Sequence, residues 1–209
     1  MNSRDTPVVF VVDDDVSVRE SLEHLIRWSG WKPQTFASAE DFLARSATDG
    51  PSCLVLDVSL PHLSGLDLQE RIVDRTDIPI IFITGHGDVP TTVKAMKAGA
   101  VEFLTKPLSD DALLNAIGQA IQRSRAALAH DANLSELRER HTSLTPRERE
   151  TMALVVSGLL NKQIALQLGI SEITVKAHRG RVMRKMRVDS LADLVRAAAA
   201  LDVPVVSRG

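Results

Sequence analysis

The stretch CLVLDVSLP, residues 53–61, carries an aliphatic run that stops at a carboxylate, Asp57. A short apolar run without alternation is typical of a strand that is covered on both faces, as in a parallel sheet flanked by helices. The runs PVVFVV (7–12) and PIIFIT (79–84) have the same character, and both also lead into polar residues. A weaker strand is indicated at 32–36 and a further strand at 101–105.

Helical patterns separate these five strands. Val18, Leu22 and Ile26 are spaced to share one helix face after the first strand. Ser38, with Asp41 three residues later, has the composition of a helix start after the second strand. The alternation predicts an α/β domain: a flavodoxin-like, doubly wound parallel sheet of five strands in the order 2-1-3-4-5.

The charge of the chain is divided unevenly. The net charge over 209 residues is −2, but residues 1–125 hold 12 Lys and Arg against 18 Asp and Glu, whereas residues 126–209 hold 13 against 9. A basic second half is compatible with nucleic-acid binding. The single cysteine, Cys53, excludes an intramolecular disulfide, and no window is apolar enough for a membrane span, so we expect a cytoplasmic protein.

The second half has the pattern of an all-α domain. Residues 145–148, Thr-Pro-Arg-Glu, form a capping box with proline at the first helical position, which begins the first of four predicted helices. The apolar stripe fades towards residue 141. We therefore expect an α/β domain at 1–125, a linker at 126–141 and a four-helix domain at 142–209. The sequence leaves open whether the linker is one long helix, a dimer-forming helix or a hinge.

Carboxylates follow two of the predicted strands. Asp13 and Asp14 follow the first strand and Asp57 ends the third. In the order 2-1-3-4-5 these strands are neighbours, and their carboxyl ends border the crevice in which ligands bind. Carboxylates placed so close together need a compensating charge, and hard oxygen ligands suit Mg²⁺. The sequence therefore predicts a magnesium site at this edge of the sheet.

Two further groups are expected at the same edge: Thr84, which ends the fourth strand, and Lys106, which follows the fifth. A divalent cation, a lysine, a hydroxyl and one acceptor carboxylate are the components of a phosphoryl-transfer site, with Asp57 as the in-line nucleophile. The alternative is that each acid acts locally. We keep that interpretation for Asp15, as the N-cap of the first helix.

The segments VVDDD, LVLDVSLPHLSG, FITGHGD, AMKAGA and EFLTKP resemble the receiver domain of two-component response regulators, over residues 7–125. The resemblance implies that Asp57 is the phosphoacceptor and Asp14 a direct Mg²⁺ ligand. It implies that Asp13 acts mostly through water and that Ser59 supplies a main-chain oxygen to the metal. Mn²⁺ or Ca²⁺ can substitute for Mg²⁺ in such a site.

The resemblance also assigns roles around the phosphoryl group. Thr84 and Lys106 would hold that group, and a cis peptide is expected between Lys106 and Pro107. Phe103 would turn inward as Thr84 moves, although a core phenylalanine in an edge strand is the alternative. Ser59 and His86 occupy positions that vary in the family and tune the lifetime of the phosphoryl group.

The stretch NKQIALQLGISEITVKAHRGRVMRKM, residues 161–186, fits a helix-turn-helix. Ala165 is small where two helices must approach, and Gly169 permits the turn. The spacing predicts a shared core of Ile164, Leu168, Ile170, Val175, Val182 and Met186. It leaves largely outside Lys176, Ala177, Arg179, Gly180, Arg181, Arg184 and Lys185. A helix with a basic outer face can enter the major groove of DNA, while a merely solvated basic helix is the alternative.

With LTPRERE before it and SLADLV after it, this stretch resembles the LuxR-type DNA-binding domain, and both halves together are similar to a NarL/FixJ-type response regulator. The resemblance implies that Lys176 and Ala177 face bases and that Lys162 and Arg184 contact the DNA backbone. Helix 191–200 would form a dimer contact on DNA. The remaining members of the predicted DNA-binding set are Thr174, Gly180 and Arg181. Gly180 lies where some members carry a long polar side chain, so base reading there is absent or shifted to Arg181.

The leading hypothesis is a two-component response regulator. A sensor histidine kinase would phosphorylate Asp57 in a Mg²⁺-dependent reaction, the phosphorylated chain would form a homodimer through residues 89–105, and the dimer would bind an operator in double-stranded DNA to control transcription by RNA polymerase. Such a chain is no enzyme beyond assisting its own phosphorylation and dephosphorylation. One alternative is a regulator that binds DNA without phosphorylation. Another is an aspartyl-phosphate phosphatase, which would want an acid where this chain has Ser59.

Overall fold

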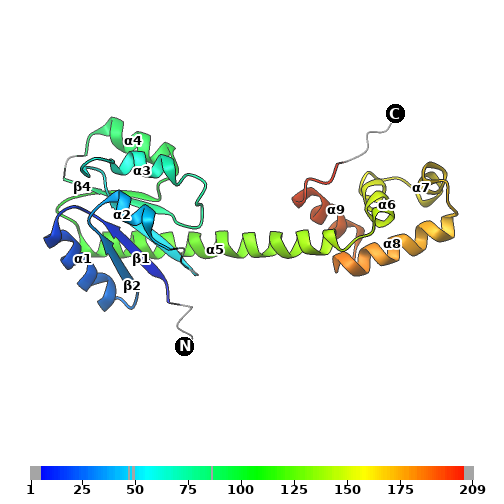
Figure 1. Ribbon diagram of the computed structural model, residues 1–209, viewed down its shortest axis with the longest axis horizontal. Helices are drawn as coiled ribbons and strands as arrows, with labels where there is room; N and C mark the ends of the chain where they lie inside the picture. The colour runs from blue at the N-terminus through cyan, green and yellow to red at the C-terminus, as the bar shows by residue number, and fades with distance from the viewer. Residues whose placement is uncertain (1–5, 47, 49, 86, 205–209) are drawn as a thin grey trace. The chain divides into compact units, whose positions relative to one another are not determined.

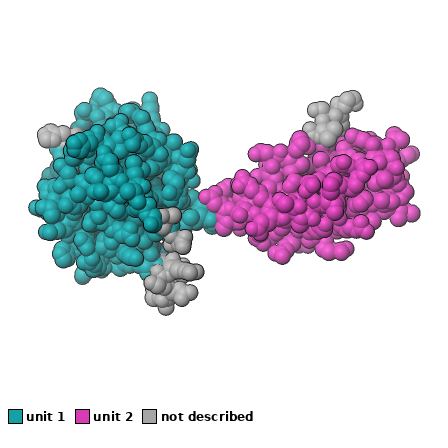
Figure 2. Space-filling view, in the orientation of Figure 1, with its two compact units in different colours: residues 1–129 teal, residues 130–209 magenta. Residues whose placement is uncertain are grey.

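The computed structural model describes residues 6–46, 48, 50–85 and 87–204. The chain divides into two compact units, Met1–Ala129 and His130–Gly209, shown in different colours in Figure 2. Each unit has a hydrophobic core of its own, and the first unit has one on each face of its sheet. Among the described residues, no helix combines the length and the apolar character needed to cross a membrane.

The first unit is built on a parallel sheet of five strands in the order β2-β1-β3-β4-β5, as the sequence predicts. The strands are β1 (Val8–Val12), β2 (Lys32–Phe36), β3 (Ser52–Asp57), β4 (Ile80–Thr84) and β5 (Glu102–Thr105). Every residue of β1, β3 and β4 is buried, whereas the edge strands β2 and β5 are partly exposed. Burial on both faces is the reason that the three inner strands are continuous apolar runs.

Helices cover both faces of this sheet (Figure 1). The helices α1 (Val16–Trp28) and α5 (Asp110–Thr142) supply the core on one face, where Val9, Val11 and Val55 point. The helices α2 (Ala39–Ala44), α3 (Gly65–Arg71) and α4 (Val89–Lys97) supply the core on the other, against Phe10, Leu54 and Phe82. Successive strand residues alternate between the two cores, as a pleated strand requires. The expected linker lies within α5 and is helical throughout.

The second unit is helical, with α6 (Pro146–Val156), α7 (Asn161–Leu168), α8 (Glu172–Met186) and α9 (Leu191–Ala200). Thr145 and Glu148 form the predicted capping box at the start of α6. Gly169 ends α7 with a φ of 65°, a left-handed conformation that glycine adopts without strain. The predicted core residues Ile164, Val175, Val182 and Met186 are buried, and Leu168 and Ile170 pack against them.

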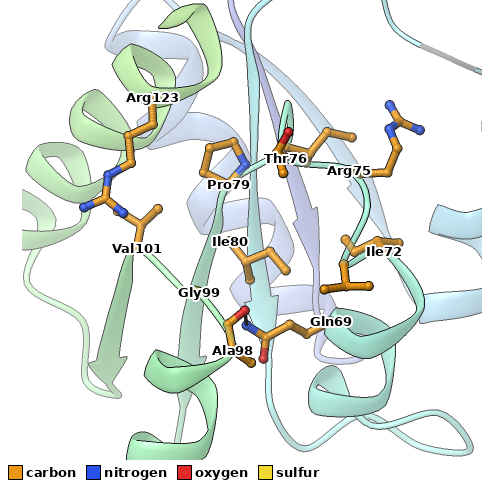
Figure 3. A pocket seen from close by; sticks show the side chains of 12 residues that line it. Gln69, Ile72, Arg75, Thr76, Pro79, Ile80, Ala98, Gly99, Val101 and Arg123 are labelled. Carbon is orange, nitrogen blue, oxygen red and sulfur yellow. Dashed lines mark hydrogen bonds between the residues drawn. The ribbon is translucent and has the colours of Figure 1, made fainter. Parts of the chain in front are cut away.

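A cavity of about 220 Å³ lies at the amino-terminal edge of the sheet, where β4 and β5 begin (Figure 3). Gln69 reaches into this region from α3, and its buried side chain donates hydrogen bonds of 3.2 Å to the carbonyl oxygens of Ala95 and Ala98. These bonds add a partner to carbonyl groups at the end of α4, where the carbonyl oxygen of Ala95 also accepts from the N–H of Ala100 at 3.2 Å. The cavity therefore belongs to the packing of α3 against α4, at the edge of the sheet remote from the predicted carboxylate site.

Candidate functional site

Three carboxylates meet at the carboxyl-terminal edge of the sheet. Asp13 follows β1 and Asp57 ends β3, and together with Asp14 they place carboxylate oxygens within 4.8 Å of one another. Asp13 and Asp57 are buried, whereas Asp14 is exposed. The register of β1 against β3 explains the meeting, because Val12 is paired with Leu56 and the next residue of each strand is an aspartate.

Lys106 connects the two buried carboxylates. Its Nζ lies 2.7 Å from Oδ2 of Asp13 and 2.6 Å from Oδ2 of Asp57. Burial lowers the pKa of Lys106, but hydrogen bonds to the two carboxylates outweigh this effect and raise it above 10.5, so the ammonium stays charged. Burial raises the pKa of Asp13 above its ordinary value, although the bond from Lys106 works against that rise. One cation thus offsets part of the repulsion between two acids.

The other oxygen of each buried carboxylate is held by the backbone. Oδ1 of Asp13 accepts a hydrogen bond of 2.9 Å from the N–H of Asp15, and Oδ1 of Asp57 accepts one of 2.9 Å from the N–H of Ser59. These bonds fix the orientation of both carboxylates. Asp15 itself caps α1 by accepting from the N–H of Ser17 at 2.8 Å, so its predicted structural role is confirmed.

A glycine that the sequence reasoning did not single out supports this site. A Cβ at Gly65 would lie 2.3 Å from the carbonyl oxygen of Asp57. The first turn of α3 can therefore lie against the end of β3 only because residue 65 has no side chain. The segment LSG of the quoted motif contains the signal, but nothing in its spacing tells which backbone atom the glycine faces.

The side chains expected around a phosphoryl group surround the same edge. Thr84 is buried at the end of β4, and its carbonyl oxygen accepts a hydrogen bond of 2.7 Å from the N–H of Lys106. The peptide between Lys106 and Pro107 is cis, as expected. Phe103 is half-buried and packs against Phe82 with ring centroids 6.2 Å apart. His86 lies outside the described residues.

The donor set fits a hard divalent cation. All three groups are carboxylates, two of them are already oriented by backbone N–H groups, and the exposed Asp14 leaves one side of the cluster open to solvent. Oxygen ligands with few protein donors are the preference of Mg²⁺, which keeps several waters. The acidic pocket of Asp13, Asp14 and Asp57 is therefore able to bind a metal.

The basic helix α8 presents a second charged surface. Val175, Val182 and Met186 are buried in the core of the second unit. The exposed side of α8 carries Lys176, Ala177, Gly180, Arg181 and Arg184. Lys162 is exposed on α7, while Thr174 is half-buried and its hydroxyl lies 2.8 Å from the hydroxyl of Ser171, the N-cap of α8.

Two residues expected outside on α8 are placed differently. Arg179 is half-buried and donates to Oδ1 of Asn161 on α7 at 2.7 Å. Lys185 is half-buried, and its ammonium donates to Glu148 at 2.7 Å and to the carbonyl oxygen of Ser143 at 3.0 Å. The expectation that these two lie largely outside is therefore wrong. Both flank the buried stripe of α8, where neighbouring helices supply partners.

The sequence matches the family described as "Response regulator receiver domain" over residues 9–118, and "Bacterial regulatory proteins, luxR family" over residues 142–198. The chain is a response regulator that joins a receiver domain to a LuxR-type DNA-binding domain. It is 50% identical to nodulation protein W of Bradyrhizobium diazoefficiens over 197 residues, a stretch that covers 94% of this chain and 87% of that protein. It is 44% identical over 193 residues to the transcriptional regulatory protein FixJ of Rhizobium meliloti, covering 92% and 95% of the two chains.

A solved structure supports the same assignment. The response regulator StyR is 48% identical to this response regulator and has a TM-score of 0.80, with 93% of this chain and 98% of that chain covered. The resemblance seen in the sequence is thus confirmed. The protein is a two-component transcriptional regulator. Its receiver domain implies a histidine kinase as partner, and its LuxR-type domain implies DNA binding.

Proposed function

We propose that this response regulator is switched by Mg²⁺-dependent phosphorylation of Asp57 by a sensor histidine kinase in the cytoplasm. The supporting observation is that Lys106 bonds Asp13 and Asp57 together at one edge of the sheet. Of the two acids, Asp13 is completely buried, while Asp57 keeps an exposed fraction of 5%. This difference supports Asp57 rather than Asp13 as the phosphoacceptor.

The chemistry follows from the groups present. A carboxylate oxygen of Asp57 attacks phosphorus in line, so that an O–P bond forms as the P–N bond to the kinase histidine breaks and its electron pair returns to the imidazole nitrogen. Lys106 then neutralises phosphoryl oxygens, and the hydroxyl of Thr84 hydrogen-bonds one of them. Mg²⁺, or Mn²⁺ or Ca²⁺ in its place, would be held by Asp13, Asp14, Asp57 and the main-chain oxygen of Ser59, and would supply positive charge that offsets the negative charge of the phosphoryl group.

The switch passes from Thr84 to the surface formed by α4 and β5. Gly87 lies beside both predicted switch residues, because a Cβ there would be 3.3 Å from the ring of Phe103 and 3.6 Å from the methyl group of Thr84. A dianion that draws Thr84 and Lys106 towards it repacks this loop. The exposed apolar side chains Val89, Val93 and Met96 on α4 support homodimerisation of the phosphorylated chain there.

The dimer would then place two helix-turn-helix units on two half-sites of a double-stranded DNA operator and act on RNA polymerase. Exposed Leu191 and Val195, four residues apart on α9, support a dimer contact of this helix on DNA. The proposed DNA contacts are those of Lys162, Thr174, Lys176, Ala177, Gly180, Arg181 and Arg184.

The experiment that tests the phosphoacceptor is the substitution Asp57→Asn. Wild-type protein incubated with acetyl phosphate and Mg²⁺ gains the mass of one phosphoryl group, and D57N gains none. The matched control is Asp67→Asn, an exposed aspartate in the first turn of α3 whose label should equal that of wild type. Label on D57N equal to wild type would show that another residue is the acceptor. Equal operator affinity with and without a beryllofluoride phosphoryl mimic would show that DNA binding does not depend on this switch.

A further inference from the structure

The exposed side of α8 has an apolar line along its centre. Residues 173, 177 and 180 follow one another at intervals of four and three, so they share one face of the helix. That face is opposite the buried Val175, Val182 and Met186. Its first member, Ile173, lies in the first turn of α8 and is 80% exposed.

A single exposed isoleucine would need no explanation, because apolar side chains are common on protein surfaces. The position of Ile173 on the helix, however, indicates a binding role. Ala177 continues the line with a methyl group and Gly180 with no side chain. The line is therefore apolar, and its side chains become shorter from residue 173 to residue 180. The end of a recognition helix that reaches base edges is its amino-terminal end, where Ile173 lies.

Gly180 has no reason within the protein to be glycine. It lies inside α8 with ordinary helical backbone, and among the described residues no atom outside the adjoining helix backbone lies within 4 Å of the position that a Cβ would take. Glycine inside a helix destabilises it relative to alanine. A close approach of something outside the protein to the backbone of α8 would account for it.

Lys176 and Arg181 flank this line, and Arg184 lies at its carboxyl-terminal end. Lys176, Arg181 and Arg184 are exposed, and among the contacts of the described residues none is a hydrogen bond or ion pair of their side chains. The major groove of DNA has the complementary arrangement, with phosphates along both walls and, at each thymine, a methyl group on its floor. A protein partner would also accept an apolar side chain, but unpaired cations on both sides favour a polyanion.

We propose that Ile173, together with Ala177, reads thymine methyl groups in the major groove, and that Gly180 allows the backbone of α8 to approach the base edges beside them. The inference rests on the proposed DNA contacts of α8 and adds a specificity-determining residue, Ile173, to them. It identifies the ligand chemistry as 5-methylpyrimidine bases at the centre of each half-site contact.

The test begins with double-stranded DNA selected from a random library by the full-length protein carrying the beryllofluoride mimic. Each thymine of the selected sequence is then replaced by deoxyuridine, which removes only the methyl group. We expect at least one replacement in each half-site to weaken binding by about fourfold, the effect of losing one buried methyl group. The variant Ile173→Ser should bind the unmodified DNA more weakly and be insensitive to that replacement.

Two matched variants separate this effect from general damage. Leu166→Ser removes an apolar side chain that is 87% exposed on α7, away from the line on α8, and should keep the thymine dependence of wild type. Gly180→Ala should raise thermal stability yet weaken binding to the selected DNA, whereas Gly118→Ala in α5, also in open space, should raise stability without changing DNA affinity.

The outcomes are distinct. Retention of the same deoxyuridine effect by I173S, or the absence of any such effect in wild type, would overturn the inference while leaving DNA binding by α8 intact. Unchanged DNA affinity of I173S with reduced transcription by RNA polymerase would assign Ile173 to a protein contact and also overturn it. Failure of the wild-type protein to select any sequence would overturn the proposed sequence-specific DNA binding itself.

Discussion

The charged side chains are paired with one another in the acidic site of the receiver domain, whereas those on the basic face of α8 are not paired with any described residue. In the acidic site, Lys106 is bonded to both Asp13 and Asp57, and each acid is also held by a backbone N–H. On α8, the exposed Arg181 and Arg184 are among the described residues that have no such side-chain bonds.

The difference separates two kinds of function. Charged groups that neutralise one another inside the chain are fixed in place, which suits a site where a phosphoryl group must be positioned. Charges without an internal partner keep their hydration and are available to an external polyanion, whose phosphates release counterions on contact. Substitutions that alter either arrangement test this difference.

The largest effect is expected from Lys106→Met. The substitution removes the cation shared by Asp13 and Asp57 and the donor that would meet the phosphoryl group, and loss of one such donor slows a reaction about 100-fold. The rate of phosphorylation by acetyl phosphate with Mg²⁺ measures it. Lys97→Met, an exposed lysine at the end of α4, serves as the control. A rate for K106M equal to that of K97M would show that the internal pairing is dispensable for the chemistry.

A smaller loss is expected from Gly65→Ala. The new Cβ would lie 2.3 Å from the carbonyl oxygen of Asp57, so α3 or the end of β3 must move, at a cost of about 1–3 kcal/mol for overpacking. Chemical denaturation and the extent of phosphorylation should both decline. Gly118→Ala is the control and should be neutral or stabilising, because no described atom outside the adjoining helix backbone lies within 4 Å of its Cβ position. If G65A behaved like G118A, the contact between α3 and β3 would not restrain Asp57.

The sequence predicts one part of the acidic site and not another. The buried apolar runs predict a doubly wound parallel sheet, and in the order 2-1-3-4-5 known for such sheets the first and third strands are neighbours, so Asp13 and Asp57 meet. The contact of Gly65 with the backbone of Asp57 could not be predicted, because it depends on how α3 packs after the turn that follows β3.

The helical domain shows the same division. Periodicity identifies the buried stripe of α8, but it does not say which side chains of other helices flank that stripe. The prediction that Arg179 and Lys185 lie largely outside is wrong for this reason, because Asn161 of α7 and Glu148 of α6 are their partners. In α5 the apolar stripe fades, yet the helix continues to Thr142, supported by the ion pair of Arg140 with Glu136 one turn away.

On the basic face, Arg184→Ala tests whether an unpaired charge meets DNA. If Arg184 neutralises one phosphate, the slope of log affinity against log salt concentration becomes shallower by about 0.9. Fluorescence anisotropy with the selected DNA at several salt concentrations measures the slope. Arg147→Ala removes an equal charge from α6, where Arg147 is paired with Glu150 at 2.8 Å, and should leave the slope unchanged. Equal slopes for both variants would remove the distinction between paired and unpaired arginines.

The smallest effect concerns a paired charge within the basic domain. The hydrogen bond from Lys185, followed by that from the N–H of Thr145, lowers the pKa of Glu148 below its ordinary value of 4.5. Because the folded-state pKa is depressed, the unfolded chain binds more protons in this range, so the contribution to stability is present above pH 4.5 and is lost as pH falls through the lower folded-state pKa. Glu148→Gln removes this dependence and keeps an acceptor for Thr145.

Hydrogen exchange of amides in α6 and α8 follows the stability of this domain separately from that of the receiver domain. Between about pH 6 and about pH 3, wild type should lose more protection than E148Q, by at most about 1 kcal/mol, the typical contribution of a capping interaction. Glu150→Gln, an exposed acid of the same helix, should follow wild type, because surface ion pairs contribute little. Parallel pH profiles for wild type and E148Q would mean that the ionisation of Glu148, although this residue is buried and bonded to Lys185, is no more coupled to folding than that of an exposed acid. Internal pairing would then no longer distinguish the fixed charges of the protein from the free ones.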